Sequence, residues 1–182
     1  MIKPAASAPT ILLKVRRLET SDVAAYRELR LESLKGHPEA FGSSWEYEAE
    51  KPISWWSQRL ETNTVFGGWV NRSPLVGLAG LQERVKSRHK GVLCGMYVRP
   101  EARGTGLAAA LVQQVIEHAR TVVEEIRLKV VASNAPARRL YSAAGFEEYG
   151  LERRALKIGC EYYDNVLMAL PLNSRLDPAS GD

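Results

Sequence analysis

The segment Arg103–Ala108 carries the strongest chemical signal in this sequence. It reads Arg103-Gly104-Thr105-Gly106-Leu107-Ala108 and separates a predicted strand from a predicted helix. A helix N-terminus has unpaired backbone N–H groups and the positive end of the helix dipole, and glycines let a ligand approach that backbone closely. Arg103 adds a permanent positive charge. The segment therefore predicts a pyrophosphate site; the alternative is a glycine-rich turn that only begins a helix.

Two common nucleotide-binding motifs do not fit this segment. A P-loop needs Lys and then Ser or Thr directly after its second glycine, and Leu107-Ala108 follows here. A Rossmann motif needs a third glycine where Ala109 stands, and an acidic residue at a strand end ~20 residues further on. The pyrophosphate is therefore expected to belong to another kind of ligand.

A second group of residues lies downstream, on another predicted helix. It reads Asn134-Ala-Pro-Ala137-Arg-Arg-Leu140-Tyr141-Ser-Ala-Ala-Gly145-Phe146. The pattern predicts a helix over 134–144, closed by Gly145, with Asn134, Ala137 and Tyr141 on one side. Taken alone, Asn134 is typical of a helix N-cap and Tyr141 of a buried core tyrosine.

Together the two segments resemble the GNAT superfamily of N-acetyltransferases. Arg103–Ala108 fits every fixed position of its signature Q/R-x-x-G-x-G/A, and Asn134–Phe146 matches N-x-x-A-x-x-L-Y-x-x-x-G-F throughout. The resemblance extends over about 12–172, but only these two motifs are specific. It implies an acyl transferase that uses acetyl-CoA as its acyl donor and an amine-bearing small molecule or peptide as its acceptor.

The resemblance also implies residue roles. The backbone amides of Arg103–Ala108 would hold the pyrophosphate, the strand before them would bind the pantetheine arm through its backbone, and Asn134 would hydrogen-bond that arm. The cofactor-binding residues expected on this basis are Met96, Tyr97, Val98, Arg103, Gly104, Thr105, Gly106, Leu107, Ala108, Asn134, Ala137 and Tyr141.

Tyr141 is the expected catalytic residue, facing the sulfur while a neutral amine attacks the thioester directly. A tyrosine has a pKa near ~10 and a thiol near ~8.5, so complete proton transfer to the thiolate is uphill by about 2 kcal/mol in water. We therefore expect Tyr141 to act as much by hydrogen-bonding the developing thiolate as by giving up its proton.

The general base is missing from its usual places. The predicted strand 91–98 holds no carboxylate or imidazole, and Lys129 stands where other family members have a Glu. Glu83 and an ordered water remain candidates. Deprotonating a lysine-like amine at pH 7 costs about 4.6 kcal/mol, against about 1 kcal/mol for an α-amine. The sequence therefore favours an α-amino or other acceptor of low pKa.

Aromatic and acidic side chains gather in the region expected to bind the acceptor. The aromatic ones are Phe41, Trp45, Tyr47, Trp55 and Trp56, and the acidic ones are Glu46, Glu48 and Glu50. They favour either packing of an irregular segment over 41–51, followed by a short helix, or an aromatic wall for an apolar or cationic acceptor. The glutamates are expected to be solvated charges, with attraction of a cationic amine as the alternative.

The elements that must position these residues predict an α/β (α+β) fold. Strands are expected near 11–18, 64–70, 75–85, 91–98, 126–131, 147–158 and 163–170, and helices near 20–36, 55–60, 106–120 and 134–144. With the resemblance, this order implies a central mixed, mostly antiparallel twisted sheet of about seven strands, flanked by about four helices. We expect one domain over 1–182, with loose tails at 1–9 and 173–182.

Composition limits the remaining possibilities. The 182 residues are 45% apolar, and the formal charge is +4. Two isolated cysteines argue against zinc and disulfides, so no metal is expected. No apolar run reaches the ~20 residues of a membrane span, so no membrane partner is expected. We expect a cytoplasmic protein that is a monomer or a homodimer.

Two other functions compete. A non-catalytic acyl-CoA-binding or sensing domain of the same fold would keep Arg103–Ala108 but would not need Tyr141. A nucleic-acid-binding module is suggested by the basic stretch 84–90, but no aromatic residue is interleaved there for base stacking. That stretch is expected to be a solvated hairpin turn, and no nucleic-acid partner is expected.

Overall fold

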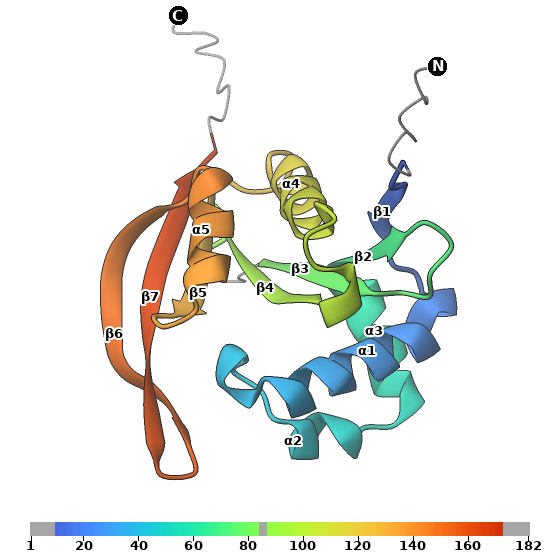
Figure 1. Ribbon diagram of the computed structural model, residues 1–182, viewed down its shortest axis with the longest axis horizontal. Helices are drawn as coiled ribbons and strands as arrows, with labels where there is room; N and C mark the ends of the chain where they lie inside the picture. Colours follow the sequence, from blue (N-terminus) through green and yellow to red (C-terminus); the bar gives the residue numbers. More distant parts are fainter. Residues whose placement is uncertain (1–9, 84–86, 173–182) are drawn as a thin grey trace, which may run out of the picture.

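Seven strands form one sheet across the part of the chain that the computed structural model describes, residues 10–83 and 87–172 (Figure 1). Their order in the sheet is β1-β2-β3-β4-β5-β7-β6. The strands are β1 (Leu13–Arg17), β2 (Thr64–Val70), β3 (Gly77–Glu83), β4 (Lys90–Val98), β5 (Glu125–Val131), β6 (Glu147–Ile158) and β7 (Glu161–Pro171). β4 and β5 pair in parallel and the other neighbours are antiparallel, which confirms the predicted mixed, mostly antiparallel sheet.

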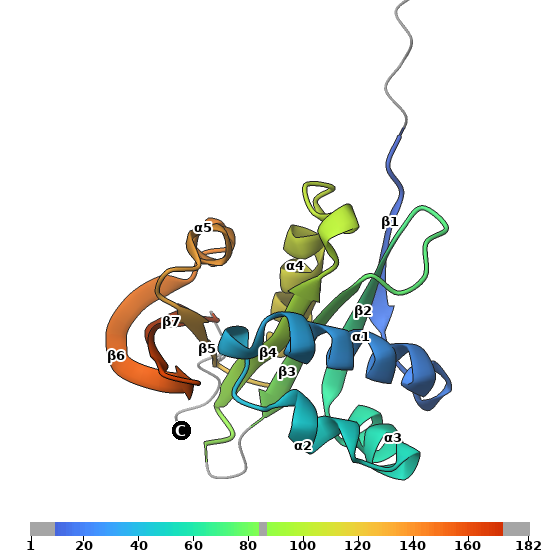
Figure 2. The ribbon, with the colours of Figure 1, turned by 60° about the horizontal axis from the view of Figure 1, so that its bottom comes forward.

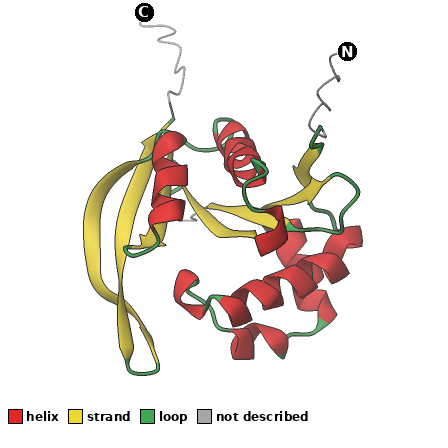
Figure 3. Ribbon diagram, viewed as in Figure 1, coloured by secondary structure: helices red, strands yellow, loops and turns green. Residues whose placement is uncertain are grey.

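Helices cover both faces of the sheet (Figures 2 and 3). The α-helices are α1 (Val23–Gly36), α2 (Trp45–Ala49), α3 (Ile53–Thr62), α4 (Leu107–Ala119) and α5 (Ala135–Ala143), and short 3-10 turns cover Thr20–Asp22, Pro38–Ala40 and Pro100–Ala102. α1, α2 and α3 lie on one face, while α4 and α5 lie on the other. Within the described residues there are thus five α-helices, where about four were expected.

The additional helix, α2, lies in the segment that was predicted to be irregular. The Ser44 hydroxyl accepts a hydrogen bond from the Tyr47 amide at 3.3 Å, which makes Ser44 its N-cap. Its five residues cover little more than one turn. An apolar repeat needs more residues than that to become visible, so periodicity could not detect this helix.

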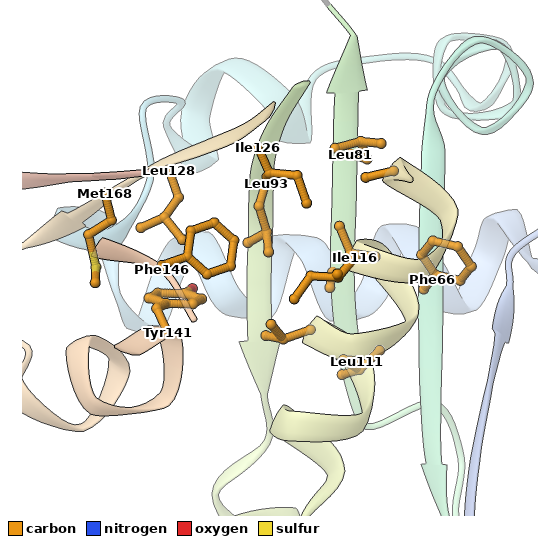
Figure 4. Packing of buried hydrophobic residues seen from close by; sticks show 14 of the residues in the cluster. Phe66, Leu81, Leu93, Leu111, Ile116, Ile126, Leu128, Tyr141, Phe146 and Met168 are labelled. Atoms are coloured by element: carbon orange, nitrogen blue, oxygen red, sulfur yellow. The ribbon is translucent and has the colours of Figure 1, made fainter. Parts of the chain in front are cut away.

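The main core lies between the sheet and the helices α4 and α5. The apolar stripe of α4 is buried as its spacing predicts, with Leu107, Leu111 and Val115 at 0% exposure. Figure 4 shows Leu111 and Ile116 of α4 packed over the central strands. A second core, centred on Trp56, lies beneath α1 and α3 on the opposite face. The two cores hold the sheet rigid from both sides.

Some predicted features fall outside the described residues. These are the tails 1–9 and 173–182, and part of the basic hairpin turn at 84–86. None of the helices within residues 10–83 and 87–172 is long and apolar enough to cross a membrane.

Candidate active site

The centre of the sheet opens between β4 and β5. These parallel strands pair only from Lys90 with Glu125 to Val92 with Arg127, although β4 continues to Val98 and β5 to Val131. Beyond that point, the facing backbone groups of the two strands have no partner in each other. Two open strand edges in the middle of a sheet are suited to an extended ligand that supplies its own amide groups.

A cavity of about 530 Å³ occupies this opening, and we call it the strand-gap cavity. Val92–Met96 of β4 form one wall and Lys129–Val131 of β5 form the other. Ala137, Leu140 and Tyr141 of α5 also line it, as does Asn134, the N-cap of this helix. The structure therefore brings Met96 together with four residues of the second sequence motif, which are separated from it along the chain.

Tyr141 is buried, at 6% exposure, beside Phe146, and the two rings meet edge to face with their centroids 5.9 Å apart. Figure 4 shows the Tyr141 ring next to Phe146 and near Met168. Burial raises the pKa of Tyr141. The phenol is consequently neutral at physiological pH, and its hydroxyl can donate a hydrogen bond within the cavity.

Asn134 has the structural role that its sequence position allows. Its side-chain oxygen accepts a hydrogen bond from the Ala137 amide at 3.2 Å, so it caps the N-terminus of α5. The same residue lines the strand-gap cavity. Capping therefore orients the Asn134 carboxamide, whose N–H groups can serve a ligand.

The segment Arg103–Ala108 forms the loop at the end of β4 that begins α4. Gly104 and Gly106 have positive φ angles, 75° and 90°, which side-chain-bearing residues rarely adopt. The Thr105 hydroxyl donates to the Ala102 carbonyl at 2.7 Å, and Arg103 Nε donates to the Val98 carbonyl at 3.2 Å. These bonds shape the loop so that it leads into the N-terminus of α4, as an anion site requires.

Three of the residues expected to bind the cofactor through their backbone, Tyr97, Val98 and Leu107, have buried side chains. Val98 and Leu107 belong to the main core, and the Tyr97 hydroxyl donates to Glu32 of α1 at 3.0 Å. Burial raises the pKa of Tyr97, as does its bond to Glu32. Any contribution of these three residues to ligand binding must therefore come from their backbone.

A second cavity of about 330 Å³ lies on the face of the sheet that carries α1 and α3, and we call it the helix-side cavity. Five residues line both this cavity and the strand-gap cavity: Arg30, Arg59, Gln82, Cys94 and Gly95. The two cavities thus meet at Cys94–Gly95 of β4. Two reactants entering from different sides would meet at this junction.

A buried ionic cluster adjoins the junction. Glu48 of α2, 1% exposed, accepts two hydrogen bonds from Arg30 of α1, at 2.8 and 3.0 Å. Arg59 of α3 approaches the same carboxylate at 3.4 Å. Burial alone would raise the pKa of Glu48, but the two arginines outweigh it and hold the pKa below its ordinary value.

This cluster corrects the expectation for Glu48, which is neither a solvated charge nor free to attract a cationic amine. The aromatic group also divides. Phe41 and Trp56 are buried in or beside the second core, Trp55 lines the helix-side cavity, and Trp45 and Tyr47 are exposed. An aromatic wall made of all five side chains is therefore absent from the described structure.

Other charged residues at the cavities escaped sequence reasoning. Glu39 and Glu152 line the strand-gap cavity, where Glu152 forms an ion pair with Lys129 at 2.7 Å. Glu83 is exposed at the end of β3 and lines neither cavity. The charges near the site thus come mainly from the N-terminal helices and β6, which contain no recognisable motif.

We expect Gly104→Ala to weaken the anion site through the backbone alone. A Cβ at Gly104 would meet nothing within 4 Å, so strain at its positive φ is the dominant effect. The left-handed conformation costs about 1–2 kcal/mol for a non-glycine residue. Urea unfolding should show a loss of that size, and calorimetry should show weaker acetyl-CoA binding. Gly36→Ala is the control, because its site is equally open and has no positive φ; equal effects of the two changes would contradict the prediction.

The structure thus combines a sheet opened between two parallel strands, a glycine loop at a helix N-terminus and a buried tyrosine at the cavity, an arrangement suited to an extended ligand. A protein-family model described as "Acetyltransferase (GNAT) family" matches residues 25–146, which are two thirds of the chain. The chain belongs to the GNAT acetyltransferase family.

Solved structures share this fold at low sequence identity. A GNAT-family acetyltransferase from Streptococcus pneumoniae is 20% identical, with a TM-score of 0.76 over 88% of this chain and 99% of that one. The ribosomal-protein-S18-alanine N-acetyltransferase of Escherichia coli is 22% identical, with a TM-score of 0.70 over 93% and 100%. YncA, a putative acetyltransferase from Salmonella typhimurium solved with its cofactor acetyl-CoA, is 19% identical, with a TM-score of 0.74 over 94% and 98%.

The similarity to a further known protein covers only part of the chain. The UPF0157 protein YqkA of Bacillus subtilis is 31% identical over 83 residues, which are 46% of this chain and 23% of that protein. The chain therefore matches about a quarter of the length of that relative.

Proposed function

We propose that this protein is an N-acetyltransferase that moves the acetyl group of acetyl-CoA to a primary amine. The observation that carries the proposal is the strand-gap cavity. Tyr141 lies in its wall, and the glycine loop Arg103–Ala108 follows β4, the strand that forms one side of the cavity. The fold of YncA, whose structure holds acetyl-CoA, supports the identity of the donor.

The donor would lie across the opening of the sheet. Its pyrophosphate would bind the backbone amides of the glycine loop and the N-terminus of α4, with Arg103 beside it. Its amide-containing arm would pair with the free edges of β4 and β5, as an added strand does. Asn134 would donate to that arm from the start of α5.

A bulge in β4 lies where the two cavities meet. The register with β3 shifts between Leu78 and Gly80, so Gly95 and Met96 together oppose one residue, and Gly95 has a φ of 65°. A bulge leaves one residue without its ladder partner. We propose that a backbone N–H freed in this way polarises the thioester carbonyl.

Tyr141 would then assist departure of the thiolate. The amine forms a bond to the carbonyl carbon, the C–S bond breaks, and the sulfur takes the electron pair. Because its raised pKa makes Tyr141 a weaker acid than a free tyrosine, stabilisation of the sulfur by a hydrogen bond is favoured over complete proton transfer.

We further propose one acetyltransferase domain for the whole chain, because strands from both of its ends share one sheet. Its two cysteines, Cys94 and Cys160, are unpaired thiols, which suits action in the cytoplasm. A non-catalytic acyl-CoA sensor is the second candidate, but it would have no need of a second cavity that meets the first at Cys94–Gly95.

Thermal unfolding and a thiol-release assay test the proposed function. Acetyl-CoA at about 100 times its Kd should stabilise the protein by about 2.7 kcal/mol, a rise in Tm of roughly 5–10 °C. Thiol release should then depend on an added amine, drawn from amino acids, polyamines, aminoglycosides and peptides. A rise in Tm with no turnover on any amine would favour the sensor, and no rise in Tm would contradict both candidates.

A further inference from the structure

The helix-side cavity has two arginines in its wall. Arg30 comes from α1 and Arg59 from α3, and both also border the junction with the strand-gap cavity. Arg30 is 5% exposed, whereas the side chain of Arg59 is 28% exposed. A buried arginine at a cavity wall is costly in free energy unless it has a partner. The charges around Arg30 and Arg59 therefore show whether the two guanidinium groups are neutralised within the protein.

The cluster retains one positive charge that Glu48 does not neutralise. Among the described residues that line the helix-side cavity there is no Asp or Glu. Glu48 lies behind the wall and balances one of the two guanidinium groups. Cys94 adds no negative charge, because burial raises the pKa of its thiol. The wall of the cavity is therefore cationic.

Both arginines direct donor groups toward the cavity. Arg30 uses Nε and Nη2 to bind Glu48, while its Nη1 would lie 3.9 Å from a Cβ built on Gly95, at the bulge. Arg59 reaches Glu48 through Nη1 alone, and its guanidinium lies over the Trp55 ring, 5.1 Å from the ring centroid. Stacking on Trp55 and the bond to Glu48 hold Arg59 in one orientation, with its remaining N–H groups available to an anion.

We infer that the acceptor carries a carboxylate beside its amine, which makes an α-amino acid the substrate class, and that Arg59 binds this carboxylate in the helix-side cavity with Arg30 behind it. The inference rests on the proposed function for the identity of the reaction. A polyamine or another purely cationic acceptor would be repelled by the same wall.

The size and the lining of the cavity agree with this class. A volume of about 330 Å³ holds a small molecule and not a folded partner. Its other walls combine neutral polar side chains, such as Gln58 and Asn63, with the apolar Trp55 and Leu78. They can accommodate the side chain of an amino acid whose charged end faces the arginines.

The two arginines also affect the acidity of the reacting amine. In a free amino acid the neighbouring carboxylate favours the ammonium form and raises the amine pKa above the ~7.7–8 of a peptide α-amine, and pairing that carboxylate with Arg59 opposes this effect. The ammonium first loses a proton to solvent, and the neutral nitrogen then forms the C–N bond while the C–S bond breaks. The nitrogen loses a second proton and the departing sulfur gains one, which yields an N-acetyl amino acid and coenzyme A.

Equilibrium binding tests the inference without any turnover. Calorimetry with saturating coenzyme A, which has no acetyl group to transfer, is run with each common L-α-amino acid, its amide and its decarboxylated amine. The best amino acid should bind at least tenfold more tightly than both of its analogues. Arg59→Gln should weaken its binding about 10- to 100-fold, as expected for loss of an ionic hydrogen bond, and should leave the amide within about threefold.

A matched control separates this site from general charge effects. Arg27→Gln removes an arginine of α1 that lines neither cavity and donates to the Ala49 carbonyl at 3.2 Å. The Arg27→Gln variant should bind the amino acid as tightly as the unmodified protein does. Kinetics should agree, with a higher KM for the amino acid in Arg59→Gln, the same KM for acetyl-CoA, and partial rescue in Arg59→Lys.

Several outcomes would overturn the inference. These are equal binding of acid and amide, no effect of Arg59→Gln, tighter binding of a peptide than of every free amino acid, and no binding by any member of the panel. Failure of acetyl-CoA to raise the Tm would instead reject the proposed function, while the binding comparison would still decide whether the cavity recognises a carboxylate.

Discussion

Replacing Tyr141 with phenylalanine is expected to lower kcat at least tenfold and to leave acetyl-CoA affinity nearly unchanged. The change removes one hydroxyl from a ring that is 6% exposed and keeps the edge contact with Phe146. A hydrogen bond to a charged group contributes about 1.5–3 kcal/mol, so its loss from the transition state corresponds to roughly 10- to 100-fold in rate. Steady-state kinetics and calorimetry measure the two quantities.

Tyr163→Phe is the matched control for this prediction. The Tyr163 hydroxyl donates to Glu161 on β7, and the residue is not among those that line the strand-gap cavity. It should retain the kcat of the unmodified protein. Unchanged turnover in Tyr141→Phe would remove Tyr141 from the mechanism, and a large loss of acetyl-CoA affinity would mean that its hydroxyl acts in binding.

Replacing Glu48 with alanine is expected to cause the largest loss of stability, about 3–5 kcal/mol at pH 7. The carboxylate is 1% exposed and joins α1, α2 and α3 through its contacts with Arg30 and Arg59. Without it, the buried Arg30 has no counter-charge. Urea unfolding measures the loss, with Glu46→Ala on the exposed side of the same helix as a control that should change stability by less than about 0.5 kcal/mol.

The same ion pair predicts how stability depends on pH. Because the folded protein holds the pKa of Glu48 below its ordinary value of 4.5, the unfolded chain takes up a proton at higher pH than the folded one. The stabilisation that ionised Glu48 gives to the folded state is complete above pH 4.5. It is lost as the pH falls through the lowered pKa that Glu48 has in the folded protein. Glu48→Ala should therefore lose less stability than the unmodified protein as the pH falls from 4.5 through the folded-state pKa of Glu48. Acid curves that stay parallel over this range, or a loss under about 1 kcal/mol at pH 7, would contradict the role given to Glu48.

Local sequence patterns predicted the strands, the α4 stripe and the helix that carries Tyr141, while the arrangement of the strands in one mixed sheet came from the family resemblance. The limits expected for β2, 64–70, and for β6, 147–158, agree with the structure. These features depend on residues close together in the chain. Apolar positions at helical spacing on α4 and positive-φ glycines in a loop act within a few residues of one another.

The second cavity and its charges could not be predicted in this way. Arg30 lies 18 residues before Glu48 and Arg59 lies 11 residues after it, on three different helices. No local repeat relates these positions, and each is an unremarkable surface charge by composition. Even α2, which carries Glu48, was expected to be irregular. The pairing is visible only when the three helices pack on the sheet.

The sequence alone thus determined the family, the glycine loop and the helix that carries Tyr141, because turn conformation, helix capping and helical periodicity are local properties of the chain. Only the tertiary structure decided where β4 and β5 separate, and which glutamate is buried between two arginines. Those outcomes depend on side chains brought together from distant elements as the two cores close around the sheet, and the charge that lines the helix-side cavity is set there.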